Sequence, residues 1–158
     1  MKKIGVILED LGMSQLAYSV IFNINKACEH NSEDDYVIFF NNMVAPVIPP
    51  NCAVMNSSEI WSFDGHLIGT SVSTALMALK SINPAKKYFY VWDLEWTRHA
   101  QRRQYSQDIP AFRSRGISLI ARSKEHAAAI QNYSNRKVSH IVSDFDIEDI
   151  HEVINNEN

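Results

Sequence analysis

The feature that most constrains the fold is the segment 88–96, which reads YFYVWDLEW. The segment is rich in aromatic residues and stays apolar until it ends in two acids, Asp93 and Glu95. A run that is apolar on both faces is typical of a strand inside a parallel sheet, where helices cover both sides. In open α/β sheets the ligand crevice lies beyond the carboxyl ends of the strands. The segment therefore predicts a parallel α/β fold with these two acids at its ligand site.

Length and composition predict one globular domain over residues 1–158. A chain of this length can bury a core without disulfides or metals. The net charge of −3 and the hydrophobic share of 46% are typical of a soluble globular protein. A negative net charge also argues against a protein that attracts nucleic acid as a whole. Residues 1–9 hold too few apolar positions for a signal peptide or a membrane span. Cys28 and Cys52 form no CxxC motif, which favours a reducing, cytoplasmic location.

Segments with strand and helix patterns alternate along the chain. Strand patterns occupy residues 4–8, 36–40, 66–69, 88–92, 117–121 and 138–142, and weaker candidates lie at 52–55 and 60–63. Helical spacing of apolar residues marks 16–29, 75–79, 127–130 and 147–154, with Ser14, Ser71 and Ser123 as helix caps. The alternation predicts a doubly wound, mostly parallel, six-stranded Rossmann-like sheet with helices on both faces.

The order of the strands decides where a ligand site can form. In the common order 3-2-1-4-5-6, the first and fourth strands are neighbours, and a crevice opens beyond their carboxyl ends. With one weak candidate counted as the third strand, 66–69 is the fourth and 117–121 the sixth, so the loops after 4–8, 66–69 and 117–121 should converge near Asp93 and Glu95. The candidate ligand-binding residues in these loops are Glu9, Asp10, Gly12, Thr70, Ser71, Arg122, Ser123 and Lys124.

The chemistry of this crevice is narrowed by the lack of phosphate-binding motifs. The chain has no GxGxxG after the first strand and no GxxxxGK[ST], so neither a dinucleotide fingerprint nor a P-loop is present. Glu9 and Asp10 lie where a phosphate would need a positive helix end, and their charge opposes an anion. Acids at this place suit sugar hydroxyls, cations or proton transfer. The alternative is that one of them, like Thr70 or Ser71, only caps a helix.

Asp93 and Glu95 are the candidate catalytic residues. A carboxylate beside aromatic side chains has its pKa raised, so the pair can serve as a general base and its orienting partner for a hydroxyl. The alternative is an ion pair with the arginines that follow. The histidines show no HxH or HExxH spacing, so we expect no metal, and no cofactor motif is present.

Charge is unevenly spread along the chain. Five of the seven arginines lie between Arg98 and Arg115, and the tail from Asp144 onward is acidic. The arginine segment can be a solvated helix face, a clamp for phosphate or an acidic acceptor, or a nucleic-acid contact. The aromatic residues interleaved with it leave stacking on a sugar or a base open.

The segment 88–95 resembles a strand of the N-terminal half of GT-B glycosyltransferases, in the group related to bacterial rhamnosyltransferases. Its pattern there is Y-F-V-Q-D-x-E, and Trp92 replaces the glutamine here. The segment 120–124, IARSK, is similar to the strand-and-serine element before the last helix of such domains. The segment 138–147 resembles the stretch that leads into their interdomain linker. Together these similarities cover nearly the whole chain.

The resemblance implies an acceptor-side domain that works without a metal. It assigns the acceptor side to residues 9–12, Asp93 and Glu95. In GT-B enzymes a C-terminal domain holds most of the nucleotide-sugar donor, and this chain stops where that domain would begin. We therefore expect a sugar or glycan acceptor as ligand, with a separate donor-binding chain as partner, or a non-catalytic sugar-binding or interaction module. An apolar patch left by the absent domain would favour a homo-oligomer.

Two other functions fit parts of the pattern. A receiver-like regulatory domain would use Glu9, Asp10 and Asp93 around a cation, with Lys124 as ionic partner. Thr70, however, precedes Asp93 in the chain, and a receiver needs the reverse order. An adaptor would bind acidic partners through the segment 98–115.

Overall fold

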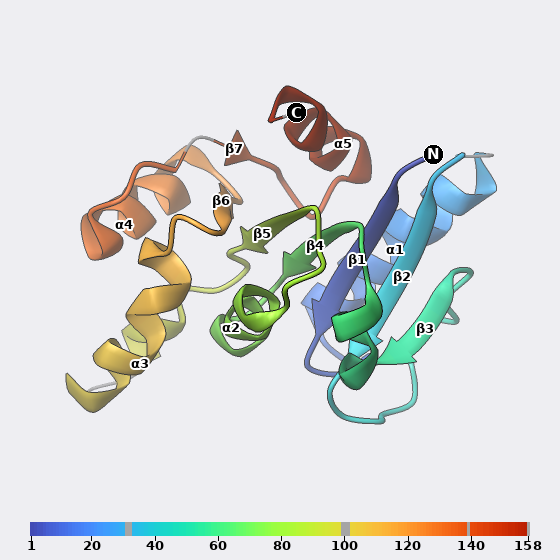
Figure 1. Ribbon diagram of the computed structural model, residues 1–158, viewed down its shortest axis with the longest axis horizontal. Helices are drawn as coiled ribbons and strands as arrows, with labels where there is room; N and C mark the ends of the chain where they lie inside the picture. The colour runs from blue at the N-terminus through green and yellow to red at the C-terminus, as the bar shows by residue number, and fades with distance from the viewer. Residues whose placement is uncertain (31–32, 99–101, 139, 158) are drawn as a thin grey trace.

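The protein folds around one seven-stranded parallel sheet (Figure 1). The computed structural model describes residues 1–30, 33–98, 102–138 and 140–157. The strand order is β3-β2-β1-β4-β5-β6-β7, and the pairs are parallel throughout these residues. The strands are β1 (Lys3–Leu8), β2 (Asp35–Phe40), β3 (Ala53–Asn56), β4 (His66–Gly69), β5 (Lys86–Tyr90), β6 (Ser118–Ala121) and β7 (His140–Ile141). The predicted doubly wound topology is confirmed, with seven strands in place of six.

The two weak strand candidates have different outcomes. The segment 52–55 overlaps β3, which supplies the additional edge strand. The segment 60–63 is not a strand, because residues Ser57–Ser62 form the 3-10 helix η1. The Asn56 side chain accepts a hydrogen bond from the backbone N–H of Ser58 at 3.0 Å and so starts this helix.

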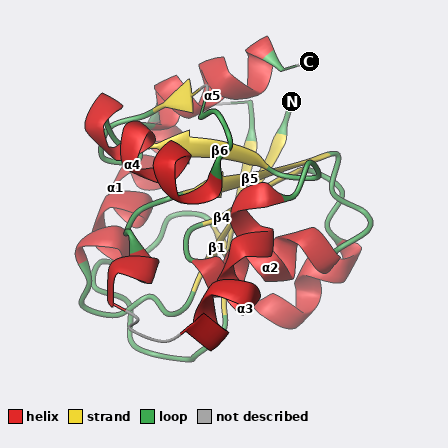
Figure 2. Cartoon of the chain, turned by 90° about the vertical axis from the view of Figure 1, so that its left-hand side faces the viewer, coloured by secondary structure: helices red, strands yellow, loops and turns green. Residues whose placement is uncertain are grey.

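Helices cover both faces of the sheet, as the sequence predicts. α1 (Gln15–Glu29) and α5 (Ile147–Asn156) pack on one face. α2 (Val72–Lys80), α3 (Arg102–Arg113) and α4 (Lys124–Ser134) pack on the other. Figure 2 shows α1 and α2 on opposite sides of the strands. The crossovers therefore change face between β1 and β4, and this change creates the switch point.

The position of strand β5 and of Val91, which follows it, explains why the start of the segment 88–96 is apolar on both faces. Tyr88 and Tyr90 point into the core under α1 and α5, while Phe89 and Val91 point into the core under α2, α3 and α4. All four side chains are fully buried. Burial of each large apolar side chain contributes about 1.5–3 kcal/mol, so both helical layers depend on this strand.

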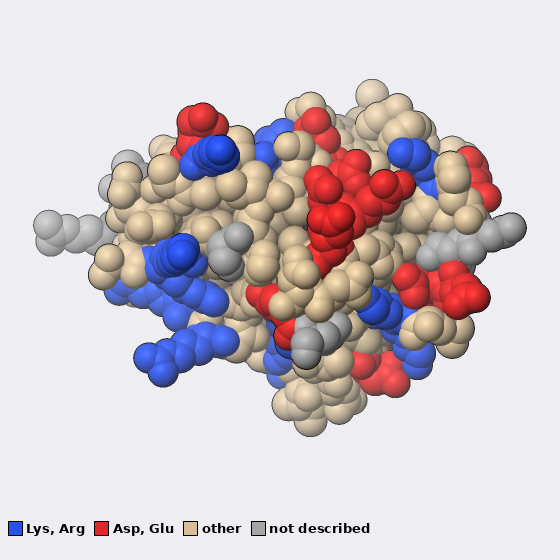
Figure 3. Space-filling view, turned by 90° about the horizontal axis from the view of Figure 1, so that it is seen from above, with Lys and Arg blue, Asp and Glu red and all other residues tan. Residues whose placement is uncertain are grey.

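The acidic tail becomes an amphipathic helix. In α5, Ile147, Ile150, Val153 and Ile154 face the core. Figure 3 shows acidic side chains gathered over α5 on the face seen from above, with basic side chains on either side of them. Among the described helices, none has the length and apolar character needed to cross a bilayer.

Candidate functional site

The ends of β1 and β4 meet at the amino end of α2. The Glu9 carboxylate, just after β1, accepts a hydrogen bond from the Ser71 hydroxyl at 2.9 Å through Oε1. Its Oε2 accepts a second bond from the Asn41 side-chain amide at 2.9 Å, which ties in the end of β2. Ser71 is also the cap of α2 and accepts from the backbone N–H of Thr74. Glu9 therefore lies at the switch point, where the topology places it.

The end of β5 reaches the same place through Glu95. Its Oε2 accepts a hydrogen bond from the backbone N–H of Val72, the first residue of α2, at 2.6 Å. Helix amino ends have unpaired N–H groups and partial positive charge, so a carboxylate is favoured there. Two acids from loops far apart in the sequence, Glu9 and Glu95, thus converge on one helix end.

The environment of Glu95 shifts its proton affinity. Burial raises the pKa of the Glu95 carboxyl above its ordinary value, and the hydrogen bond from Val72 opposes this rise. The charges of Asp108, Asp93 and Glu9 raise the pKa further. A carboxyl group in this state is suited to take up a proton from a bound hydroxyl.

This raised pKa predicts a pH-dependent stability. The folded chain holds the Glu95 proton more tightly than the unfolded chain, so its contribution is complete below the ordinary pKa of 4.5 and is lost as pH rises through the folded pKa. We expect Glu95→Gln to remove this loss, because glutamine can still accept from Val72 without carrying charge. Urea unfolding between about pH 4 and 8 should show the wild type losing stability relative to the variant. If the stabilities of the wild type and Glu95→Gln changed with pH in the same way, the prediction would be contradicted. Glu152→Gln, which removes an exposed acid of α5, is the control and should follow the wild type.

Asp93 has the ion pair that the sequence left as an alternative. Its carboxylate pairs with Arg98, and both side chains are largely exposed, at 44% and 69%. Exposed pairs of this kind contribute about 0–1 kcal/mol. The backbone of residues 99–101 and the side chains of Arg102 and Arg103 lie outside the described residues. Within the rest of the arginine segment, Arg113 donates through Nε to the backbone carbonyl of Ser134 at 2.8 Å.

The side chains of Thr70 and Asp10 form hydrogen bonds with backbone groups. The Thr70 hydroxyl is buried and donates to the carbonyl of Ile7 at 2.7 Å, which links the ends of β1 and β4. Asp10 accepts from the N–H of Gly12 at 2.8 Å and closes the turn after β1. Neither Glu9 nor Asp10 caps α1, because Ser14 does so.

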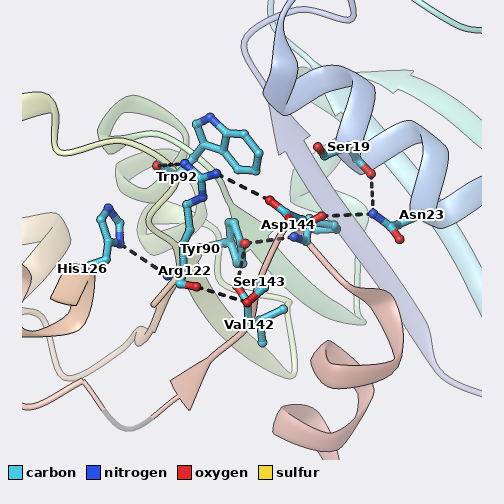
Figure 4. Close-up of polar contacts among 10 residues, drawn as sticks. Ser19, Asn23, Tyr90, Trp92, Arg122, His126, Val142, Ser143 and Asp144 are labelled. Atoms are coloured by element: carbon cyan, nitrogen blue, oxygen red, sulfur yellow. Dashed lines mark hydrogen bonds and ion pairs between the residues drawn. The ribbon is translucent and has the colours of Figure 1, made fainter. Parts of the chain in front are cut away.

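A second group of polar residues lies beyond β5, β6 and β7 (Figure 4). The Arg122 guanidinium stacks over the Trp92 ring, 3.9 Å from its centroid, and donates to the Trp92 carbonyl at 3.3 Å. It also lies 3.6 Å from the Asp144 carboxylate. Burial and the Arg122 charge lower the pKa of His126, whose Nδ1 accepts from the Arg122 backbone N–H at 3.4 Å. Of the other two predicted residues, Ser123 caps α4, and Lys124 is exposed in its first turn.

The turn that carries Asp144 has an unusual backbone. Asp144 and Phe145 both have positive φ, at 49° and 59°, a region that non-glycine residues rarely adopt. The Tyr90 hydroxyl fixes this turn, because it donates to the Val142 carbonyl at 2.8 Å and accepts from the Phe145 N–H at 2.9 Å. Asn23 of α1 donates to the Asp144 carbonyl at 3.1 Å. No sequence pattern predicts this arrangement, because the partners are far apart in the chain.

The described residues hold no cluster of three or more His, Cys, Asp or Glu side chains arranged to bind a metal ion. No protein-family model matches the chain, and comparisons with curated proteins and with solved structures find no significant match.

Proposed function

We propose that the chain is a glycosyltransferase-like domain of the acceptor-side type, which binds a sugar or glycan at the carboxyl ends of β1, β4 and β5. The observation that carries this proposal is the convergence of Glu9 and Glu95 on the amino end of α2. The strand order places a switch point there, and such points are the usual ligand sites of open α/β sheets.

The charge at the switch point favours hydroxyl groups over phosphates. A phosphate would bind the free N–H groups at the start of a helix, but Glu95 already accepts from Val72 there. A carboxylate accepts strong hydrogen bonds from sugar hydroxyls. In this proposal Glu95 is the base for an acceptor hydroxyl, Asp93 orients it, and Glu9 and Ser71 hold further hydroxyls. Arg122, with Ser123 and Lys124, supplies the cationic side of the same rim.

The donor would come from elsewhere. In this proposal the domain acts together with a donor-binding partner, or as a sugar-binding or interaction module without catalysis. Cytoplasmic location and self-association belong to the same proposal.

A sugar titration tests the proposal. We expect methyl α-L-rhamnopyranoside or methyl α-D-glucopyranoside to shift the backbone amide resonances of Ser71 and Val72 in a ¹⁵N-labelled sample. Glu9→Gln should weaken binding about tenfold, because hydrogen bonds to charged groups are the stronger ones. Glu152→Gln, an exposed acid on α5, should leave the affinity unchanged. Absence of any shift with these glycosides, with a wider glycan panel and with UDP-glucose would rule the proposal out.

A further inference from the structure

A groove of about 680 Å³ runs along the outer side of α2. Helix α2 forms its floor, and η1 and α3 form its two walls, an arrangement that can be followed in Figure 1. Of the candidate site residues from the sequence, Glu95 alone lines it among the residues described. The groove could not be predicted from the sequence, because the segment 60–63 was expected to be a strand, whereas η1 forms one wall of the groove there.

Trp61 gives the groove an aromatic wall. It lies on η1, and its side chain is 50% exposed, so a large apolar surface is open to solvent. Its neighbour Ile60 is buried and anchors η1 to the core. The Asn83 side chain donates to the Trp61 carbonyl and holds the same turn from the loop after α2. Trp61 is therefore an exposed ring on a fixed backbone.

Polar groups with fixed positions line the rest of the groove. Asn56 at the end of β3, Ser73 on α2, and Gln107 and Asp108 on α3 contribute amide, hydroxyl and carboxylate groups from three elements. Asn56 and Ser73 lie close to helix starts, where the backbone is fixed by capping bonds. An apolar wall with a few polar groups from different elements is typical of small-molecule sites.

Glu95 joins this groove to the switch point. Its Oε2 is engaged by Val72, whereas no hydrogen bond within the described chain uses Oε1. Among the described lining residues, Glu95 and Asp108 are acids and Lys80 is a cation, so this part of the lining favours neutral groups over anions. A neutral ring with an apolar face and several hydroxyls suits this lining. Its apolar face can stack on the Trp61 indole, and its hydroxyls can donate to the carboxylates.

We infer that the groove between η1, α2 and α3 binds the pyranose ring of the acceptor, with Trp61 stacked on its apolar face and Glu95 facing a hydroxyl. This inference rests on the proposed function and adds the location of the ring and its uncharged chemistry. It also assigns binding roles to Trp61 and Gln107.

Titration with methyl α-L-rhamnopyranoside, methyl α-D-glucopyranoside and glucose 6-phosphate tests this inference. We expect the two neutral glycosides to shift the indole N–H resonance of Trp61. Glucose 6-phosphate should bind more weakly than methyl α-D-glucopyranoside. Trp61→Ala should weaken binding of the neutral glycoside about tenfold, the effect of one lost stacking contact. Gln107→Ala, at an exposed position, should weaken it severalfold without risk to folding.

The matched control is Phe22→Ala. Phe22 is an exposed aromatic residue of α1 with nearly the same exposure as Trp61, 49%, and it lies on the other face of the sheet. Its removal should leave binding unchanged. If Trp61→Ala and Gln107→Ala bind like the wild type while Glu9→Gln binds weakly, the groove is not the ring site and the proposed function still holds. If the wild type binds no sugar, both fail.

Discussion

Phe145→Ala is expected to lower the free energy of unfolding by about 3–5 kcal/mol, the range for removal of a buried phenylalanine. Phe145 is fully buried and packs edge-on against Tyr90, with ring centroids 5.0 Å apart. It joins the core formed by α1, α5 and the sheet. Alanine would leave a cavity there and would keep the positive φ of 59°. Urea unfolding followed by circular dichroism measures the change.

Phe22→Ala provides the comparison for this experiment. Phe22 is half-exposed on α1 and stacks on the ring of Tyr18, with ring centroids 5.8 Å apart. Its removal should change the free energy of unfolding by about 0.5 kcal/mol or less. Loss of Phe145 should also disturb the neighbouring turn, so the stacking of Arg122 on Trp92 would weaken and the Trp92 indole resonance would move. Equal stabilities of the two variants would contradict the packing described for Phe145.

The sheet could be predicted because its strands carry a strong signal. Residues 88–91 are buried on both faces, and such a pattern is typical of a strand that helices cover on both sides. The serines at 14, 71 and 123 cap α1, α2 and α4 as expected, since a hydroxyl before a helical pattern has a local physical reason. Local rules of this kind need no knowledge of the rest of the chain.

The error at η1 has an equally local cause. Ile60 and Phe63 are the buried residues of the segment 60–63, and Trp61 is exposed. In a strand, residues two apart share a face, but these buried residues are three apart, which is the period of a 3-10 helix. Four residues are too few to distinguish the two periods.

The candidate site was predictable only in part. The strand order brings Glu9 and Glu95 together, so their proximity follows from topology once the order is assumed. The partner that each acid takes depends on side-chain geometry, which no pattern reports. The turn at Asp144 and Phe145 is harder still to predict, because phenylalanine rarely has a positive φ and nothing in its identity indicates one here.

The position of α2 depends on Gly69, and Gly69→Ala should cost about 3 kcal/mol, the upper end of the usual range for overpacking. A Cβ atom at this last residue of β4 would lie 2.7 Å from both the nitrogen and the Cα of Ala75. These are backbone atoms of α2, so the whole helix would have to move. We expect that movement to break the bonds of Glu9 with Ser71 and of Glu95 with Val72. Urea unfolding measures the cost, and amide shifts of Ser71 and Val72 report the displacement.

Gly116→Ala separates this steric effect from the general loss of a glycine. A Cβ at Gly116 would meet its nearest neighbours, in Leu79 and Ser114, at 3.5 Å, which is ordinary contact. The unfolded chain loses freedom when glycine becomes alanine, so this variant should be as stable as the wild type or up to about 1 kcal/mol more stable. Sugar binding should survive in Gly116→Ala and fall in Gly69→Ala, because only the second displaces the helix end that holds both acids. Unchanged stability of Gly69→Ala would mean that α2 does not approach β4 this closely, and the convergence of Glu9 and Glu95 would lose its basis.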